Sequence, residues 1–323
     1  MATHQHLISE SASTTKPNNK QGQLARPTSV KGEFLWPYAL MIGSLHLASL
    51  LVFLPWLFSW TGLILLLVGI HVYGQGITIC YHRLLTHHSF KTHKWFERLW
   101  VVISLCSMQD TPARWVANHR FHHSHSDEQP DPHSPLVSFL WSHVGWLLYR
   151  NHETHNASML QKHARDILHD PFYMKLEKTP LAYLIYVIHA ALYFLVGLII
   201  GWTANGSLLA GTQFGLSLLV WGVLVRTVVV WHITWSVNSL THLFGYRNYE
   251  TNEGSRNNWF VALISFGEGW HNNHHYDQVA ASVQRRWWEI DIIYYEIKLL
   301  EKLGLVYDIV PPKHIRDASR TKQ

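Results

Sequence analysis

The chain has 323 residues, of which 48% are apolar, 13% aromatic and 15% charged, and its formal net charge is +5. The charged fraction lies well below the quarter that is usual in soluble domains, and the 16 Trp are typical of chains that meet the boundary between hydrocarbon and water. The positive charge comes without an aromatic-basic recognition motif. It therefore indicates anionic lipid head groups or an acidic partner and excludes a nucleic-acid-binding protein.

The N-terminal residues 1–33 are polar and lack an apolar core followed by a cleavage site, so we expect a disordered cytosolic tail instead of a signal peptide. A membrane domain is expected over residues 34–305 and a C-terminal tail over residues 306–323. The only cysteines, Cys80 and Cys106, are too few for a disulfide framework or an iron–sulfur site, and we expect both to be buried and reduced.

Four apolar runs approach the ~20 residues that a helix needs to cross a bilayer. They are residues 37–57, 61–81, 181–202 and 214–235. Only residues 58–60 separate the first two runs, and the uncharged residues 203–213 separate the last two. The pattern predicts an all-α integral membrane protein with four transmembrane helices in two hairpins and a helical cytosolic cap.

Charge predicts the orientation of the two hairpins. No charged residue lies between Glu33 and Arg83 or between Lys178 and Arg226. Residues 82–178, in contrast, contain eleven Lys and Arg. Because short loops rich in Lys and Arg stay in the cytosol, both turns should face outward and both chain ends inward. Arg226 lies inside the fourth run, where it either faces the bundle interior or reaches toward the interface.

Two further segments are predicted as helices outside the spans. Trp95–Gln109 is moderately apolar but short and contains charged residues, which suits a helix lying at the membrane interface. Gln284–Leu305 carries apolar residues at helical spacing, which predicts an amphipathic helix that packs on the cap or on the lipid surface. Its apolar positions include Trp287, Ile290, Ile293, Ile297 and Leu300.

Three histidine motifs stand out. The pattern H-x-x-H-H occurs at His119–His123 and at His271–His275, and a looser H-x-x-x-x-H occurs at His82–His87. A chain with 25 His in 323 residues gives about 0.15 accidental matches to the first pattern, so two matches are significant. On a helix, spacings of three and four place the imidazoles on one face. The two hairpins bring all three motifs to the same side of the membrane.

Eight imidazoles exceed what one tetrahedral site can use, so two metal ions are implied. A structural zinc site would use four ligands and usually Cys, and a hydrolytic zinc site would need an H-E-x-x-H motif, which is absent. A metal transporter would carry its ligands along a path within the spans. A dinuclear iron centre that activates O₂ fits best, with a lipid chain from the bilayer as substrate.

The residues around these motifs resemble a known family. They are Gly76-Ile77-Thr78, Asp131-Pro132-His133, Ser142-His143-Val144-Gly145-Trp146 and Gly267-Glu268-Gly269-Trp270. Over roughly residues 62–304 the chain resembles the integral-membrane fatty acid desaturases, specifically the Δ9 (stearoyl-type) group. The resemblance implies an enzyme with two Fe ions that uses O₂ and two electrons to remove two hydrogens from a saturated acyl chain, leaving a cis double bond and water.

The resemblance also implies the metal ligands. They are His82, His87, His119, His122, His123, His271, His274 and His275. The motif Asn238-Ser239-Leu240-Thr241-His242 adds His242 as a direct ligand and Asn238 as one acting through water. His88, His125, His133 and His143 lie off the motif positions and are expected in an outer layer or on the surface. Asp127 and Asp131 could fix the tautomers of ligand imidazoles.

Similar enzymes hold the acyl chain in a bent tunnel, and the residues near its kink correspond to Gln109, Trp115 and Thr234. The animal acyl-CoA enzymes carry an Arg where this chain has Ala117, and a basic pair where it has Arg150-Asn151. Arg150 remains a substrate-binding candidate. The loss of two cations favours an acyl group on a membrane lipid over acyl-CoA.

The other partners follow from the same resemblance. No electron-transfer domain is fused to the chain, so a separate donor such as ferredoxin or cytochrome b5 is expected. The expected location is the plasma (inner) membrane of a bacterium or the endoplasmic reticulum of a eukaryote. The alternatives are a related hydroxylase or ketolase with the same histidine motifs, or a membrane metal-binding or transport protein.

Overall fold

The computed structural model describes residues 23–320. Most of the expected N-terminal tail, residues 1–33, lies outside the described residues. Within its described part, residues 30–33 are not disordered as expected: they belong to β1 (Val30–Phe34), which pairs antiparallel with β3 (Tyr149–Asn151) of the cap.

Four helical segments are long and apolar enough to cross a membrane, which confirms the predicted fold class. The first is α1 (Trp36–Ser49) with a 3₁₀ turn to Phe53, and the second is α2 (Trp60–Gln75), continued as a π-helix over Gly76–Thr86. The third is α9 (Leu181–Asn205). The fourth comprises α10 (Leu208–Leu219), a π-helical stretch (Val220–Val225) and α11 (Arg226–Leu243). The second and fourth segments run past the predicted ends, so His82 and His242 lie on the spanning helices themselves.

Local capping residues determine where the hairpins turn. The Ser59 side chain accepts a hydrogen bond from the Gly62 N–H and starts α2. Gly206 has φ +62°, which ends α9 in a left-handed conformation, and Ser207 caps α10. The predicted turn over residues 203–213 was therefore too long, because two capping residues are enough to reverse the chain.

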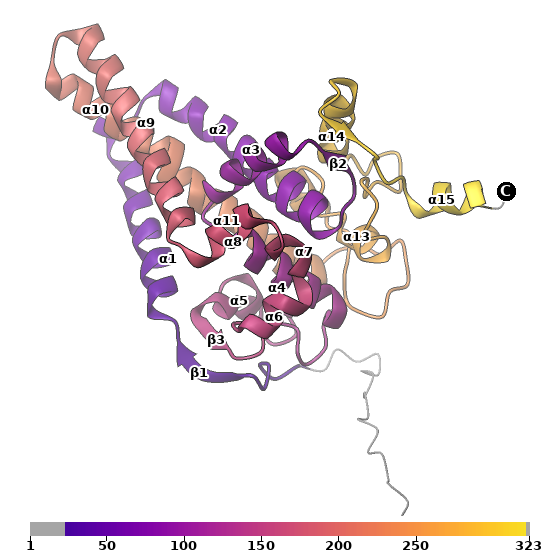
Figure 1. The fold of residues 1–323 in the computed structure, drawn as a ribbon. Coiled ribbons are helices and arrows are strands. Elements are labelled where there is room, and N and C mark those ends of the chain that lie inside the picture. Colours follow the sequence, from indigo (N-terminus) through magenta and orange to yellow (C-terminus); the bar gives the residue numbers. More distant parts are fainter. Residues whose placement is uncertain (1–22, 321–323) are drawn as a thin grey trace, which may run out of the picture.

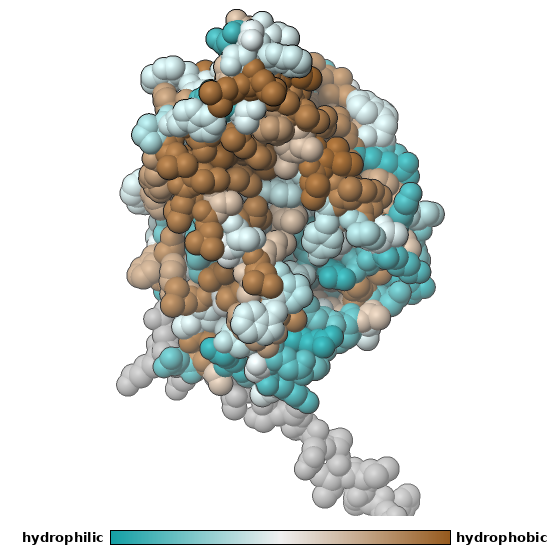
Figure 2. All heavy atoms as spheres, turned by 90° about the vertical axis from the view of Figure 1, so that its left-hand side faces the viewer, coloured by the Kyte–Doolittle hydropathy of each residue, from teal (hydrophilic) through white to brown (hydrophobic). Residues whose placement is uncertain are grey.

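The third and fourth spans approach each other closely. A Cβ on Gly211 would lie 2.6 Å from the Leu198 carbonyl oxygen, and one on Gly215 would lie 2.6 Å from that of Phe194. Small residues permit such close helix packing in membranes, where burial of apolar surface gives little driving force. Toward the lipid, side chains such as Leu47, Leu192 and Ile199 are exposed. Figure 2 shows the resulting apolar band on the face that carries α1, α9 and α10.

The remaining helices form the cap, which lies to the right of α1, α9 and α10 in Figure 1. Before α9 they are α3 (Lys94–Leu105), α4 (Pro112–His125), α5 (Phe139–His143), a 3₁₀ turn (Gly145–Leu148), α6 (Ala157–His163), α7 (Arg165–Leu168) and α8 (Pro171–Lys178). After α11 they are α12 (Trp259–Ile264), α13 (His271–Tyr276), α14 (Ile292–Lys302) and α15 (Lys313–Arg320). The strands β2 (Lys91–Thr92) and β4 (Val306–Tyr307) pair antiparallel. The main apolar core joins the π-helix of the second span to α3, α4, α8 and α14.

Two predicted segments differ from the structure. Only residues 292–302 of the amphipathic stretch 284–305 are helical, because Asp291 caps α14 and Glu289 accepts the backbone N–H groups of Arg285 and Arg286, which holds the preceding residues in a loop. The expected C-terminal tail, residues 306–323, contains β4 and α15 within its described part.

Arg226 faces the interior of the bundle and does not reach the interface. Its guanidinium donates to the Cys106 carbonyl oxygen at 2.6 Å and lies 3.8 Å from the centre of the Tyr73 ring. Both cysteines are free and buried, as predicted.

The α9–α10 contact gives a first prediction. Gly211→Val should lower the free energy of unfolding by about 1–3 kcal/mol, because the added methyl groups must push apart two backbones already in contact. Thermal unfolding in detergent measures this. Gly43→Val in α1 is the matched control, since nothing lies within 4 Å of its added Cβ. Equal melting temperatures for the two variants would show that the contact does not stabilise the hairpin.

Candidate metal centre and adjoining cavity

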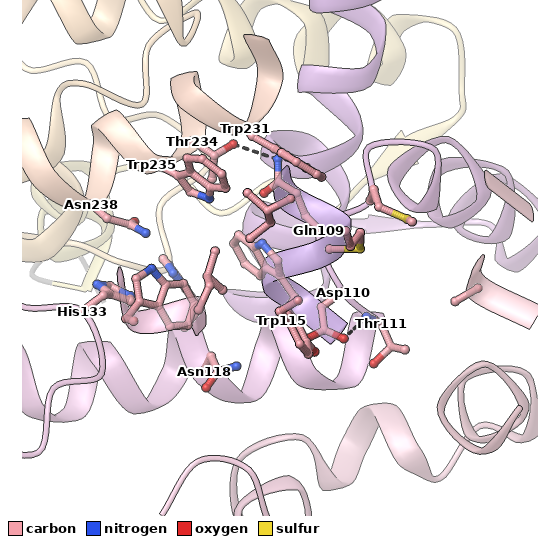
Figure 3. A pocket seen from close by; sticks show the side chains of 18 of the residues that line it. Gln109, Asp110, Thr111, Trp115, Asn118, His133, Trp231, Thr234, Trp235 and Asn238 are labelled. Carbon is pink, nitrogen blue, oxygen red and sulfur yellow. Dashed lines mark hydrogen bonds between the residues drawn. The ribbon is translucent and has the colours of Figure 1, made fainter. Parts of the chain in front are cut away.

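A cavity of about 1120 Å³, including its open mouth, lies between the spans and the cap. Apolar side chains from α1, α3, α9 and α11 line much of its wall, including Ile42, Leu105, Ala182 and Trp231. Polar side chains also line it, among them Asn118 of α4, Asp110 of the preceding loop and Asn238 of α11 (Figure 3). A cavity of this kind suits an apolar chain whose position is fixed by a small number of polar contacts.

Three of the predicted substrate residues meet in this cavity although they are distant in sequence. The Gln109 side chain donates from Nε2 to Thr234 Oγ1 at 3.0 Å, and the Trp115 ring stacks on His119 with centroids 4.9 Å apart. Met108 and Asp110, on either side of Gln109, have φ of +55° and +69°. Such strained backbone in non-glycine residues is often kept where a side chain must be aimed.

Asn238 also lines the cavity, whereas Arg150 is not among its lining residues. Arg150 lies on β3, half of its side chain is exposed, and its guanidinium is 3.5 Å from the Glu33 carboxylate. The pairing of β1 with β3 therefore explains the position of Arg150 without a substrate.

The π-helix aligns the first histidine motif. Residues five apart point in different directions on an α-helix, but a π-helix bonds each N–H to the carbonyl five residues earlier. Here the His87 N–H donates to the His82 carbonyl oxygen at 3.1 Å. The two imidazoles therefore lie one above the other, with ring centroids 4.9 Å apart.

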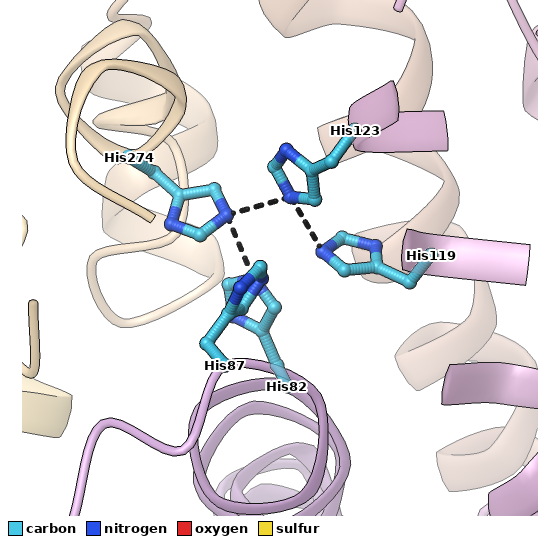
Figure 4. A group of neighbouring side chains, drawn as sticks. All are labelled: His82, His87, His119, His123 and His274. Atoms are coloured by element: carbon cyan, nitrogen blue, oxygen red, sulfur yellow. Dashed lines mark hydrogen bonds between the residues drawn. The ribbon is translucent and has the colours of Figure 1, made fainter. Parts of the chain in front are cut away.

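The second and third motifs lie on two short helices that face each other, α4 and α13. Together with the π-helix and α11 they bring the nine predicted histidine ligands into two groups. The first group is His82, His87, His119, His123 and His274 (Figure 4). The second group is His122, His242, His271 and His275. The groups adjoin, since the rings of His123 and His275 have centroids 4.6 Å apart.

The spacing of ring nitrogens within each group cannot come from hydrogen bonds alone. Nε2 of His274 lies 3.1 Å from that of His82 and 3.0 Å from that of His123. The His123 nitrogen also lies 3.0 Å from that of His119. A neutral imidazole nitrogen carries either one hydrogen or one lone pair, so four nitrogens form at most two hydrogen bonds, and the three contacts exceed that number.

The second group repeats this pattern. Nε2 of His271 lies 3.1 Å from that of His242 and 3.0 Å from that of His275. Nitrogens bound about 2.1 Å from one metal ion, at right angles to each other, lie about 3.0 Å apart. In the first group, Nε2 of His87 is buried without a hydrogen-bond partner among the described residues. Both groups therefore fit a metal ion that binds several imidazoles.

Burial disfavours the charged form of several of these imidazoles, and a histidine must be neutral to bind a metal ion. It lowers the pKa of His87, His119, His123, His274 and His275 well below the ordinary value, and neighbouring imidazoles lower it further.

Carboxylates bind the outward nitrogens of three ligands. Nδ1 of His242 donates to Asp127 at 2.8 Å and Nδ1 of His122 donates to Asp131 at 3.0 Å, as expected from the sequence. Nδ1 of His82 lies 2.7 Å from Glu268, which was not predicted. The sequence feature that could have indicated Glu268 is its place in the motif Gly267-Glu268-Gly269-Trp270, directly before the third histidine motif. These contacts fix the tautomer that leaves Nε2 free for a metal.

Glu268 belongs to a buried network that ties the first motif to α14. Arg83 donates to Glu268 at 2.8 Å and forms two hydrogen bonds of 3.0 Å with Asp291. Burial alone would raise the pKa of Glu268, but its interactions with His82 and Arg83 lower it to about 2. Burial likewise opposes ionisation of Asp127, yet attraction to His242 and three hydrogen bonds hold its pKa below the ordinary value.

The four histidines off the motif positions lie outside both groups. His133 stacks near His122, with centroids 4.3 Å apart, and lines the cavity. His143 contacts Ser239 and His232, His88 contacts Asp166, and His125 contacts the Phe121 carbonyl oxygen.

Fold and site together define a class: a membrane protein whose spanning helices carry a site suited to metal ions beside an apolar cavity. A protein-family model described as fatty acid desaturase matches residues 54–310. The chain is 43% identical over 284 residues to an sn-1 stearoyl-lipid 9-desaturase of Anabaena variabilis, covering 87% of this chain and 96% of that protein.

Two further relatives differ in what they act on. The chain is 36% identical over 296 residues to an sn-2 palmitoyl-lipid 9-desaturase of Nostoc sp. strain 36, covering 90% and 96% of the two chains. It is 37% identical over 279 residues to an acyl-CoA 5-desaturase of Anemone leveillei, covering 86% and 80%. The chain belongs to the fatty acid desaturase family, as the sequence resemblance predicted, and is an oxidoreductase that acts on fatty acyl chains.

The carboxylates around the ligands give a second prediction. Asp127→Asn should weaken metal binding about 10–100-fold, because an amide no longer favours the His242 tautomer that presents Nε2. Metal content after dialysis against graded chelator measures this. Asp308→Asn, at an exposed carboxylate paired with Lys91, is the control. If both variants retain metal equally, the carboxylate does not support the site.

Proposed function

We propose that this desaturase introduces a cis double bond at Δ9 into a saturated acyl chain carried on a membrane lipid, at a centre of two Fe ions and with O₂ as co-substrate. The observation that carries the proposal is the convergence of nine imidazoles in two adjoining groups at the wall of an apolar cavity. The names of the relatives from Anabaena variabilis and Nostoc sp. support the Δ9 position and the lipid carrier.

In this proposal His82, His87, His119, His123 and His274 hold one ion, and His122, His242, His271 and His275 hold the other. Asn238 would act on the second ion through a water molecule. It precedes His242 by four residues on α11, so the two side chains share a helix face, and it also lines the cavity. When bound, the Fe ions would supply activation of O₂, which takes up two substrate hydrogens, two donor electrons and two protons from solvent and is reduced to two water molecules.

The chain's own residues supply positioning. The hydrogen bond between Gln109 and Thr234 closes one wall of the cavity, and Trp115, stacked on His119, forms the wall between cavity and imidazoles. If the cavity holds the acyl chain in the bent form that the family resemblance implies, only one pair of methylenes lies beside the metal site, which would determine the position and the cis geometry of the double bond. Such positioning contributes to rate by holding the reacting atoms in place, and no acid or base is required.

An acyl-lipid substrate agrees with the charges around the cavity. Ala117 supplies no cation, and Arg150 is paired with Glu33 outside the cavity lining, so neither provides a phosphate-binding group for coenzyme A. Arg150 is therefore dropped from the proposed substrate contacts. Acyl-CoA remains the second carrier to test, since the relative from Anemone leveillei is named for it.

A separate one-electron donor, ferredoxin or cytochrome b5, would supply the electrons. Both chain ends and the cap would lie in the cytosol, because the segment between the hairpins carries eleven Lys and Arg. The membrane would be the plasma (inner) membrane of a bacterium or the endoplasmic reticulum of a eukaryote.

Expression in a host without a desaturase, with a ferredoxin system supplied, tests the reaction. Gas chromatography of the fatty acids should detect a new cis-9 monoenoic acid, and lipid-class separation should find it first in intact glycerolipids. His274→Ala should abolish it. A hydroxy acid in place of the monoene would contradict desaturation, and a product found first in acyl-CoA would contradict the lipid carrier.

The cavity wall gives a separate prediction. Gln109→Leu should lower monoene formation about tenfold or shift the double bond, because the wall loses its hydrogen bond to Thr234 and the chain is no longer held in one position. Mass spectrometry of derivatised esters gives amount and position together. Arg150→Gln serves as the control and should change the amount less than twofold. An unchanged product from Gln109→Leu would remove this residue from the substrate contacts.

A further inference from the structure

Helix α14 has two apolar faces, and only one of them is covered within the described residues. Ile293 and Ile297 are buried in the core of the cap. On the other side Tyr295, Leu299 and Leu303 follow one another at helical spacing and are 53–62% exposed. A helix on a soluble surface normally turns polar residues outward, so a second apolar stripe indicates contact with something apolar.

The residues before α14 extend this stripe. Trp287 is 88% exposed and Ile290 is 57% exposed, although both are large and apolar. They are presented by an ordered loop, since the buried Glu289 accepts the N–H groups of Arg285 and Arg286 and the hydroxyl of Tyr246. We call this set the α14 surface: Trp287, Ile290, Tyr295, Leu299 and Leu303.

The α14 surface is continuous with the transmembrane bundle. Glu296, on α14, lies 2.7 Å from Nε2 of His71, which is within the second membrane span. Phe266 packs its ring against the same His71 at 4.7 Å. Figure 1 shows α14 beside the span that begins with α2, on the opposite side of the molecule from α6.

Positively charged side chains surround the α14 surface, as expected for a surface that contacts phospholipid head groups. Arg285 and Arg286 are exposed and directly precede Trp287, and Lys298 and Lys302 flank the apolar stripe on α14. Tryptophan prefers the membrane interface, and cations there bind lipid phosphates. One acidic residue of α14, Glu301, is paired with Lys298, and another, Glu296, is turned toward His71.

We infer that the α14 surface lies in the interfacial layer of the bilayer and that Arg285 and Arg286 bind anionic lipid head groups there. This region is a membrane contact in addition to the four spans, and it sets the depth in the bilayer of the segment that carries the third histidine motif. The inference does not depend on the reaction that the protein catalyses.

An environment-sensitive fluorophore tests the contact in nanodiscs of stated lipid composition. Leu299→Cys and Trp287→Cys are labelled, since the two native cysteines are buried. Both labels should emit at shorter wavelength than in water and be quenched by doxyl-labelled lipid. Leu47→Cys on the lipid face of α1 is the positive control, and Gln161→Cys, exposed on α6, is the negative control.

The proposed binding of anionic head groups by Arg285 and Arg286 is tested by a separate measurement. Adding phosphatidylglycerol to phosphatidylcholine nanodiscs should shift the emission of the label at 287 further to the blue, and Arg285→Gln with Arg286→Gln should remove that shift. Labels at 287 and 299 that behave like the one at 161 would overturn the membrane contact. An emission shift on adding phosphatidylglycerol that is absent, or that persists in the Arg285→Gln, Arg286→Gln variant, would overturn the role of the two arginines.

Discussion

The meeting of nine imidazoles, nitrogen to nitrogen, is the constraint on which the rest of the structure depends. No carboxylate lies among the facing Nε2 atoms, and their contacts are too many for hydrogen bonds. The helices that carry these imidazoles must therefore be held in place by contacts with residues outside the two histidine groups. Asp127, Asp131 and Glu268 do this by binding the outward nitrogens of ligands on three different helices. Each carboxylate both orients a ring and fixes the element that bears it.

The spans and the cap are consequently parts of one framework. The second and fourth spans extend beyond the lipid-facing hairpins and end in the site, where they supply His82 and His242. Arg83, buried beside His82, links Glu268 to Asp291, which also caps α14. Removing one partner would leave charges buried without compensation, which is costly, so the network favours a single arrangement of the site.

Composition and spacing were sufficient to predict the membrane architecture and to single out the three histidine motifs, because apolar length and histidine periodicity are local signals, whereas His242 followed from the family resemblance. Contacts between distant residues were not predictable in this way. Glu268 and Arg83 are 185 positions apart, and nothing in either segment indicates that they meet. The start of α14 was misplaced because Trp287 and Ile290 continue its apolar pattern, whereas the actual boundary is determined by the capping of Asp291. The pairing of Arg150 with Glu33 across β1 and β3 likewise cannot be seen in the sequence.

The π-helix has a consequence for how the three motifs compare. The paired rings of His82–His87, His119–His123 and His271–His275 have centroids 4.9, 4.6 and 4.4 Å apart, although the first pair is five residues apart and the others four. A π-turn is an α-helical turn with one residue inserted. The three histidine pairs are therefore the same structural unit, although the first pair is separated by one residue more than the others. When the first motif is aligned with the other two, its one extra residue must therefore be placed between the two histidines. The wider π-helical turn accommodates that residue, and the segments before and after the histidine pair stay aligned.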